Sequence, residues 1–440
     1  MERTARVKTW RTPRWLLVVV VLAMFGAACG DSDGGAGTDG GDGGSTDDGG
    51  GGGSVSLLHA IGGEGEQAAL QAALDIFEQS TGNTVEAEFT DDFATTLGIR
   101  IDGNNPPDVA FFPQPGALQG AVDDGAVTSF DDAGVVTAGL APGVLEAGTF
   151  DGTAYGVVVK QALSSLLWYN LPAFEAGDHS PPESWDELLS LTEEISATGT
   201  PAWCIGIESG GATGWVATNW IEDVMLRLHG GDVYDQWTTG ALAFDSPEVR
   251  EAFELAGEIF FDEDAVLGGT TGILNTPFGT AAAPMFQDPP ACLMHRQAGF
   301  IEGSFEGELG TDYGLTLMPP IDGNGGAIFS GDLAAILSDN PVAGELVSFL
   351  VSSEAQEAWH GHEGSGSLSV RGDFDASVYP SASLAQQGEL LAAQDVARFD
   401  GSDLMPSAVG GEAFFTELVA WLNGQDLDTT LANIDAAWPM

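Results

Sequence analysis

The chain has 440 residues, long enough for two or three domains' worth of buried core, and its hydrophobic fraction of 43% is typical of a globular protein. Only 12 basic residues stand against 66 acidic ones, which gives a formal net charge of −54 at pH 7. A surface this acidic repels phosphate backbones, so the composition excludes nucleic acid as a partner. It also disfavours anionic ligands and anionic membrane surfaces.

Residues 1–28 have the organisation of a targeting segment. Five basic residues, the last of them Arg14, precede an apolar stretch from Trp15 to Phe25 that is short for a membrane span. With the small residues before Cys29, the pattern resembles a bacterial lipoprotein signal, which implies that Cys29 is lipidated and becomes the new N-terminus. Residues 29–54 are almost wholly Gly, Asp, Ser and Thr and predict a solvated tether. We therefore expect a lipid anchor at the outer face of the cytoplasmic membrane.

The folded body is expected to begin with alternating strands and helices. Val55–Ala60 is a predicted strand, and apolar residues three and four apart predict a helix from Glu64 or Glu66 to Gly82. Thr84–Phe89 alternates as a strand, a helix is expected over Asp92–Arg100, and a buried strand follows. This order predicts an α/β lobe with a mostly parallel sheet, whose ligands bind beyond the carboxyl ends of its strands.

Helix starts and one turn are also visible further along the chain. Ser184-x-x-Glu187 has the form of a capping box, and Ser353-x-x-Gln356 predicts a second cap. Ser246-Pro247 and Asn340-Pro341 each place proline at the first position of a helix. Asp151-Gly152 predicts the turn of a hairpin.

Four short motifs stand in a fixed order: Asn105-Pro-Pro-Asp-Val109, Asp151-Gly-Thr-Ala-Tyr-Gly156, Leu167-Trp-Tyr-Asn170 and Pro181-Pro-Glu-Ser-Trp-Asp-Glu-Leu188. In this order the chain resembles the extracellular solute-binding proteins of ABC importers, and the maltose-binding-like family 1 best. The segments Cys204–Asp223, Pro289–Gln297 and Ser402–Pro406 are most similar to the branch of α-glucoside-binding proteins. The resemblance covers roughly residues 55–439.

The resemblance implies a two-lobed α/β fold of the type II periplasmic-binding-protein class with a ligand cleft between the lobes. Lobe 1 would comprise residues 55–160 with a return segment of about 328–370, and lobe 2 residues 161–327 with C-terminal helices over about 380–440. The implied function is a lipid-anchored receptor, not an enzyme, that binds an α-glucoside or small oligosaccharide and delivers it to a membrane permease. We expect a monomer without cofactor or metal.

Apart from Cys29, two cysteines remain, Cys204 and Cys292. In an exported protein an even remainder indicates one disulfide. A metal site or a thiol nucleophile is the alternative, although the chain has neither a CxxC nor an HExxH spacing. His360-Gly-His362 after a helix is expected at the surface.

Candidate ligand residues follow from loop position, chemistry and resemblance together. The first lobe supplies Glu64, Asp92 and Gln114 at strand ends, while Lys160 and Asp332 lie at the expected crossings between the lobes. The second lobe supplies Glu208, Trp215, Trp220, Asp223 and, after the second cysteine, His295 and Arg296. Trp359 is an aromatic candidate at a helix end.

Each candidate has a structural alternative. Trp220 and Trp359 are large enough to belong to the core, and Asp223 could serve the first turn of a helix. Trp215, expected in a loop after Gly214, is the strongest stacking candidate, and Glu208 precedes a Gly-Gly pair that would leave its carboxylate accessible. Two other functions share the pattern of aromatics beside acids: a secreted glycoside hydrolase that uses two carboxylates, and a sugar-sensing or adhesion lipoprotein.

Overall fold

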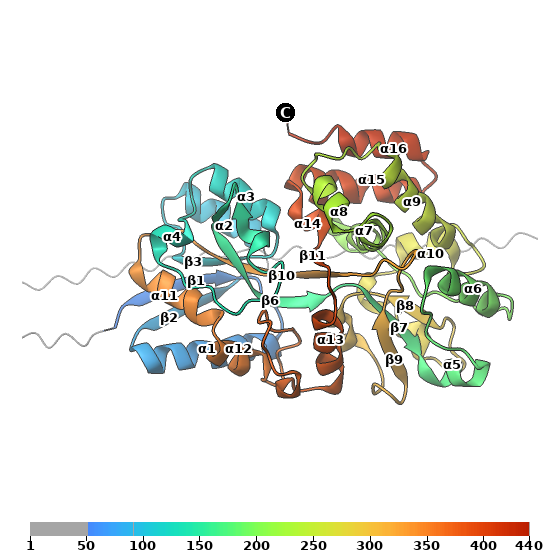
Figure 1. The fold of residues 1–440 in the computed structure, drawn as a ribbon, viewed down its shortest axis with the longest axis horizontal. Coiled ribbons are helices and arrows are strands. Elements are labelled where there is room, and N and C mark those ends of the chain that lie inside the picture. The colour runs from blue at the N-terminus through green and yellow to red at the C-terminus, as the bar shows by residue number, and fades with distance from the viewer. Residues whose placement is uncertain (1–51, 91, 440) are drawn as a thin grey trace, which may run out of the picture. The chain divides into compact units, whose positions relative to one another are not determined.

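The computed structural model describes residues 52–90 and 92–439, which belong to one compact unit, Gly50–Met440. The expected targeting segment, the lipidation site Cys29 and nearly all of the expected tether lie outside the described residues. Two lobes, each with its own sheet, are joined by the long strands β6 (Gly156–Leu163) and β10 (Ala327–Ile336) (Figure 1). Among the described residues, no helix is both long and apolar enough to cross a membrane.

The sheet of lobe 1 has the strand order β11-β10-β3-β1-β2, with β6 paired to β10. Strands β1 (Ser54–His59), β2 (Thr84–Phe89) and β3 (Val109–Phe112) are parallel to one another, and β11 (Ala397–Phe399) is parallel to β10. Strand β10 runs antiparallel to β3 and to β6. The expected parallel sheet is therefore correct for β1 to β3, and the returning strand β10 makes the sheet mixed.

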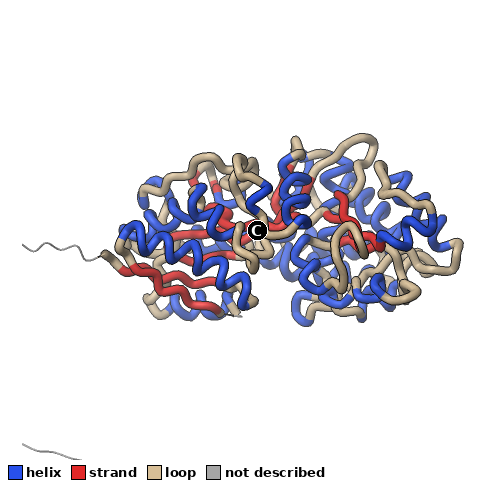
Figure 2. Tube along the Cα trace, turned by 90° about the horizontal axis from the view of Figure 1, so that it is seen from below, coloured by secondary structure: helices blue, strands red, loops and turns tan. Residues whose placement is uncertain are grey.

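Helices lie around the strands of each lobe (Figure 2). The first lobe carries α1 (Glu64–Thr81), α2 (Phe93–Asp102), α3 (Pro115–Asp123), α4 (Phe130–Ala133), α11 (Pro341–Leu350) and α12 (Ser353–His360). Its small hairpin consists of β4 (Thr149–Phe150) and β5 (Thr153–Ala154). The carboxyl ends of β1, β2 and β3 lead directly into α1, α2 and α3, so the loops at these ends gather on one edge of the lobe.

The second lobe is built on a three-stranded antiparallel sheet of order β8-β7-β9, with β7 (Leu166–Asn170), β8 (Met294–Arg296) and β9 (Tyr313–Leu317). Its helices are α5 (Leu171–Gly177), α6 (Trp185–Ser196), α7 (Trp215–His229), α8 (Gly231–Thr238), α9 (Pro247–Phe260) and α10 (Gly269–Asn275). The C-terminal part adds α13 (Ala382–Ala392), α14 (Gly401–Leu404), a π-helical turn Ala408–Phe414, α15 (Phe415–Leu422) and α16 (Leu427–Asp435). Aromatic and aliphatic side chains of α7, α9, α15 and α16 form the largest core cluster.

Most local expectations are confirmed. The first strand and helix differ from their predicted bounds by a residue or so, and β2 matches exactly the predicted Thr84–Phe89. Asp151 and Gly152 form a two-residue turn between β4 and β5, with φ of 50° and 78°. Left-handed φ values at both central positions are what a tight hairpin turn requires.

Four helix caps can be compared with their predictions. Ser184, Ser246 and Asn340 each accept a hydrogen bond from a backbone N–H in the first turn of α6, α9 and α11. The cap expected at Ser353 is wrong, because the side chain that accepts the bond from Ala355 N belongs to the preceding residue, Ser352. Gln356 is fully buried and donates instead to the carbonyl oxygens of Val159 and Leu350, at 2.8 and 2.9 Å.

The disulfide Cys204–Cys292 is present, with a Cα–Cα distance of 5.5 Å. It joins the segment that precedes α7 to the segment that leads into β8, 88 positions later in the chain. In the chain-entropy account, a cross-link across a loop of this length contributes about 4–5 kcal/mol to stability. The disulfide therefore holds the loop between Cys204 and α7 against the central sheet of lobe 2.

A buried ion network connects lobe 2 to both long strands. Asp223 on α7 accepts hydrogen bonds from Arg227 Nη1 at 2.6 Å, from Arg296 Nε at 2.8 Å and from Ser165 Oγ at 2.5 Å. Ser165 lies between β6 and β7, and its Oγ also accepts from Ile328 N of β10 at 2.8 Å. Arg227 donates to the carbonyl oxygen of Gly326, just before β10, at 2.8 Å.

The pKa of Asp223 reflects this surrounding. Burial by itself would raise the pKa, but Arg296 and then Arg227, with the hydrogen bond from Ser165, outweigh it and hold the pKa below the ordinary value. The carboxylate is therefore ionised in the folded protein at neutral pH. The stability that it contributes is present above the unfolded-state pKa of about 3.9 and is lost as the pH falls through the lower folded-state pKa.

We predict that Asp223→Asn lowers the free energy of unfolding at pH 7 by about 3–5 kcal/mol, because it leaves two buried guanidinium groups without their counter-ion. Chemical denaturation followed by tryptophan fluorescence measures the change. Asp235→Asn is the matched control, since Asp235 also holds an arginine, Arg398 at 2.6 Å, but at a half-exposed position. The control should cost at most about 1 kcal/mol. Equal losses in the two variants would contradict the role given to the network.

Candidate functional site

Lys160 forms the centre of a charged group on the strands that cross between the lobes. Its Nζ lies 3.4 Å from Glu66 Oε1 and 3.5 Å from Asp332 Oδ2. Asp332 is the register partner of Lys160 on β10, and Glu66 comes from the first turn of α1, at the carboxyl end of β1. We call Lys160, Glu66 and Asp332 the lysine triad.

The lysine triad carries a net negative charge. Burial of Lys160 favours its neutral form, but Asp332 and then Glu66 outweigh this effect and raise its pKa. His59, the last residue of β1, lies within the field of the same groups, and burial lowers its pKa, so its imidazole is neutral at pH 7. One ammonium beside two carboxylates offers hydrogen-bond donors and acceptors to a ligand, with no spare positive charge for an anion.

An aromatic group on lobe 2 consists of Trp215, Phe278 and Phe300. The ring centroids of Trp215 and Phe278 are 5.2 Å apart, those of Trp215 and Phe300 are 6.0 Å apart, and Phe300 is 43% exposed. Phe300 belongs to a short 3-10 helix, Gly299–Ser304, that packs against β6, the strand that carries Lys160. The aromatic group therefore lies beside the crossing strands and presents an accessible ring.

Glu208 lies next to this aromatic group. Its backbone pairs with residues 276–278. Glu208 N donates to the carbonyl oxygen of Thr276 at 3.1 Å, and Phe278 N donates to the carbonyl oxygen of Glu208 at 3.0 Å. The half-buried carboxylate accepts a hydrogen bond from Gly210 N at 3.0 Å. An acceptor beside a ring face is a combination that suits polyhydroxylated rings, which stack on one and donate to the other.

Trp215 is not in a loop, as the sequence suggested, but is the first residue of α7. Gly214 before it has φ 121°, and a Cβ at this position would meet the backbone of Phe415 at 2.6 Å. Only glycine fits this turn, which explains how the chain starts a helix immediately after the Gly-rich segment. The side chain of Trp215 is half-buried.

Two first-lobe candidates, Glu64 and Asp92, lie at the surface just after the ends of β1 and β2. Glu64 begins α1 and is exposed, whereas its neighbour Glu66 makes the contact with Lys160. Asp92 is exposed and caps α2, accepting a hydrogen bond from Thr95 N at 3.3 Å. The expected position of these residues at strand ends is correct, but their carboxylates do not join the lysine triad.

Two of the candidate tryptophans, Trp220 and Trp359, are fully buried in the cores of the two lobes. Trp220 packs edge-to-face against Trp203 and Phe260, at centroid distances of 5.1 and 5.5 Å, in the core of lobe 2. Trp359 stacks on Phe111 in the core of lobe 1, at 6.1 Å. Both satisfy the alternative that large aromatic side chains belong inside.

The charged candidates Asp223 and Arg296 are also buried, and they pair with each other. Each is 1% exposed, and each is engaged by the other in the buried ion network. His295 is equally buried, with its Nδ1 2.7 Å from the carbonyl oxygen of Cys204. His360, expected at the surface, is fully buried, and burial lowers its pKa to about 3.

Gln114, which precedes α3, links the first lobe to the C-terminal part of the chain. Its Nε2 donates to Asp403 Oδ1 at 3.1 Å. Asp403 belongs to α14, whose first N–H groups, those of Gly401 and Ser402, donate to the carboxylate of Glu222, both at 3.1 Å. Three acids therefore cluster here, Glu222, Asp400 and Asp403, around the start of α14.

Glu222 is fully buried in this cluster. Burial and then the neighbouring carboxylate of Asp400 raise its pKa well above the ordinary value, and the two backbone hydrogen bonds offset only part of this effect. In the unfolded chain a glutamate ionises above about pH 4.3. The folded protein therefore holds a proton here that the unfolded chain releases, and stability falls as the pH rises between the two pKa values.

We predict that Glu222→Gln removes part of the loss of stability between pH 5 and pH 7. For each pH unit in this window, the unfolding free energy of the wild type should fall by up to about 1.4 kcal/mol relative to that of the variant. Denaturant titrations at a series of pH values measure the slope. Glu258→Gln, at an exposed position of α9, is the control and should keep the wild-type slope. A wild-type slope in Glu222→Gln would show that its carboxyl is ionised in the folded protein.

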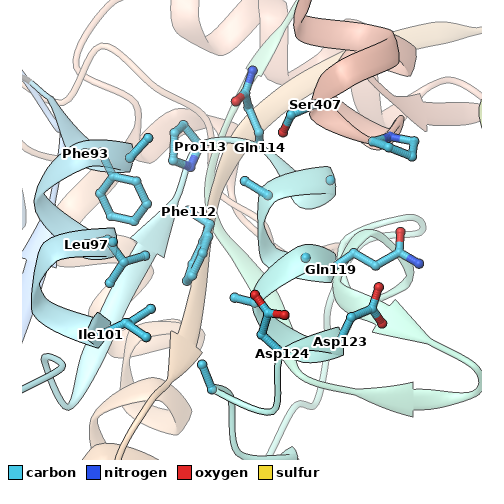
Figure 3. A pocket seen from close by; sticks show the side chains of 18 of the residues that line it. Phe93, Leu97, Ile101, Phe112, Pro113, Gln114, Gln119, Asp123, Asp124 and Ser407 are labelled. Carbon is cyan, nitrogen blue, oxygen red and sulfur yellow. The ribbon is translucent and has the colours of Figure 1, made fainter. Parts of the chain in front are cut away.

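A hollow of about 650 Å³ lies between α2 and α3 of lobe 1, with Gln114 at one edge, and Pro406, Ser407 and Pro439 of the C-terminal part also line it. Figure 3 shows Phe93, Leu97 and Ile101 on α2 directed toward Phe112, while the polar side chains Gln119 and Asp123 lie on α3 and Asp124 directly follows it. The interior of this hollow is apolar, which suits a polyol poorly. We therefore place the candidate site at the lysine triad and the aromatic group.

The sequence reasoning missed Glu66, His59, Phe278 and Phe300 at this site. Glu66 could have been found, because it shares the first turn of α1 with Glu64 and lies after a strand end. Phe278 and Phe300 are brought to Trp215 from segments more than sixty positions away, and no local pattern marks them.

Comparison with known proteins connects this geometry to a family. Residues 61–357 match the family of bacterial extracellular solute-binding proteins. The osmoprotective compounds-binding protein GgtB of Synechocystis sp. is 36% identical over 395 residues, which cover 88% of this chain and 92% of that protein. The alpha-glucosides-binding periplasmic protein AglE of Rhizobium meliloti is 33% identical, over 85% of this chain and 84% of its own.

Solved structures share the fold. The bacterial solute receptor AcbH has a TM-score of 0.72 at 16% identity, covering 88% of this chain and 96% of that one. A chitin oligosaccharide binding protein has a TM-score of 0.70, also at 16% identity, covering 87% and 97%. The motifs, the two lobes and these matches agree: the chain belongs to the bacterial extracellular solute-binding proteins of ABC transporters, and it is a binding protein rather than an enzyme.

Proposed function

We propose that this protein binds a neutral carbohydrate, an α-glucoside or a small oligosaccharide, between the aromatic group and the lysine triad. The observation that carries the proposal is the accessible aromatic face of Trp215 and Phe300 beside the carboxylate of Glu208. The relative named for binding α-glucosides supports the same class of ligand.

The charge distribution supports a neutral ligand. Each of the seven Lys and Arg side chains among residues 52–439 already forms a salt bridge with a carboxylate. In that part of the chain an anionic ligand would find no cation free of such a partner, and the acidic surroundings would repel it. Hydroxyl groups, in contrast, donate to carboxylates and accept from the ammonium of Lys160 without any charge to compensate.

The same proposal includes delivery to a permease. In a two-lobed receptor a ligand that contacts both lobes stabilises the closed arrangement, and the membrane subunits distinguish closed from open. Residues of the lysine triad belong to lobe 1 and the crossing strands, and the aromatic group belongs to lobe 2, so a ligand between them would contact both sides. We propose that a lipid on Cys29 holds the receptor, as a monomer, at the outer face of the cytoplasmic membrane.

We predict saturable binding of at least one neutral sugar in a calorimetric panel of maltose, trehalose, sucrose and short α-glucans. Three or four hydroxyl and ring contacts, less the cost of closure, correspond to dissociation constants in roughly the micromolar range. Glucose 6-phosphate and glucuronate, the anionic comparisons, should bind at least tenfold more weakly than glucose or not at all. Binding of the anions alone would contradict the proposal. A shape change on sugar binding, seen by small-angle scattering, separates a transport receptor from an adhesion module.

We predict that Trp215→Ala and Phe300→Ala each raise the Kd of the sugar by about 10- to 100-fold, because each removes one ring worth about 1.5–3 kcal/mol of apolar burial. Phe261→Ala is the matched control: Phe261 is also exposed, at 42%, but lies at the end of α9 against Trp421. It should leave the Kd unchanged. Unfolding temperatures of the ligand-free variants check that the losses arise at the site and not in the fold.

A further inference from the structure

A cavity of about 330 Å³ lies against the crossing strands, outside the candidate sugar site. Its walls come from three segments that connect the lobes: Gln161 on β6, Phe329 on β10, and Arg371 and Tyr379 in the segment that returns from lobe 1 to α13. Ala141 lines it from lobe 1 and Leu391 from α13. The cavity therefore borders segments that would bend or slide if the lobes moved.

This cavity and the lysine triad lie on opposite faces of the crossing strands. Asp332 pairs with Lys160 in the register of β10 and β6, and the adjacent residue pair is Gly331 with Gln161. Because neighbouring residues of a strand point to opposite faces, Gln161 and Phe329 lie on the face away from Lys160 and Asp332. The two sites are thus separated by one layer of sheet.

Gln161 presents an unused hydrogen-bond acceptor. Its side chain is 4% exposed, and its Nε2 donates to the carbonyl oxygen of Ser369 at 2.5 Å. Within residues 52–90 and 92–439, no group donates to its Oε1. An amide oxygen at a cavity wall without a protein donor can accept a hydrogen bond from a ligand hydroxyl.

The other polar groups at the cavity indicate an uncharged ligand. The guanidinium of Arg371 is already held by Asp373, at 2.7 and 2.8 Å. The Tyr379 hydroxyl accepts from Ser369 N at 2.9 Å, and burial raises its pKa to about 12, so it stays neutral. Phe329, Phe374 and Tyr379 supply aromatic surface. The volume is about twice that of a cavity that holds one benzene ring.

We propose that this cavity is a second small-molecule site, for an uncharged aromatic or alicyclic compound of about two rings. A hydroxyl group of this compound donates a hydrogen bond to Gln161 Oε1. Occupancy of the cavity is linked to closure of the lobes on sugar. The linkage rests on the proposed function. A rotation about the crossing strands that brings the lobes together on the side of the lysine triad separates the walls on the opposite side. An occupant that holds these walls apart therefore favours the closed arrangement and strengthens sugar binding.

The test uses 2-naphthol as the probe and the protein from residue 29 onward. Ligand-observed NMR should show saturable binding of 2-naphthol below about 1 mM, and at least tenfold weaker binding of 2-methoxynaphthalene, which lacks the donor, and of 2-naphthoate, which is charged. Saturating 2-naphthol should lower the sugar Kd at least threefold by calorimetry. Reciprocity then requires saturating sugar to lower the Kd of 2-naphthol by the same factor.

Three variants locate the effect. Gln161→Leu should abolish the preference for 2-naphthol over its methyl ether, and Ala376→Trp, at the cavity wall, should fill the space and prevent binding. Ala117→Trp, in the apolar hollow between α2 and α3, is the control and should leave 2-naphthol binding intact.

Absence of 2-naphthol binding to the wild type, or its loss in the control variant alone, overturns the site. Binding that leaves the sugar Kd unchanged overturns the linkage. A protein that binds 2-naphthol but none of the sugars contradicts the proposed function and leaves the second site standing.

Discussion

The carboxylate of Asp223 is the interaction on which the arrangement of lobe 2 depends. It is buried between two arginines and a serine, and through them it contacts α7, β8 and the ends of both long crossing strands. Two guanidinium groups without this counter-ion could not remain inside a protein at acceptable cost. The network therefore fixes where β6 and β10 enter lobe 2. It thereby sets the orientation of lobe 2 relative to the lysine triad on these strands.

The fixed entry of these strands positions the residues of the proposed site. Lys160 and Asp332 lie on the same crossing strands that the network anchors, while Trp215 begins the helix that carries Asp223. The aromatic group and the charged group are thus positioned by one continuous piece of structure. Because every lysine and arginine of the described residues is neutralised within the protein, the extreme acidity of the chain remains at the surface and favours uncharged ligands.

Local sequence patterns predicted elements well wherever the interactions that form them are local. The helix Glu64–Thr81, the strand Thr84–Phe89, the turn at Asp151-Gly152 and the cap at Ser184 depend on periodicity, φ preference or one side chain that reaches its own helix. Ser184 and Ser353 both begin a capping-box pattern, but only Ser184 caps its helix. At the second position the preceding residue, Ser352, is the cap, and Gln356 forms a hydrogen bond across the core instead.

The candidate site was predicted less completely than the fold. Lys160 pairs with Asp332, and Trp215 and Glu208 both lie against Phe278, but Trp220 and Trp359 are core residues and Asp223 and Arg296 neutralise each other. By itself the sequence determined the secondary structure, the two-lobed class and the family, because these depend on short-range patterns and on motif order. Only the tertiary structure decided which aromatic and charged side chains are buried or paired and which remain accessible. Burial and pairing depend on residues tens to hundreds of positions away, and a tryptophan or a carboxylate looks the same in a sequence whether it lies in the core or at a binding site.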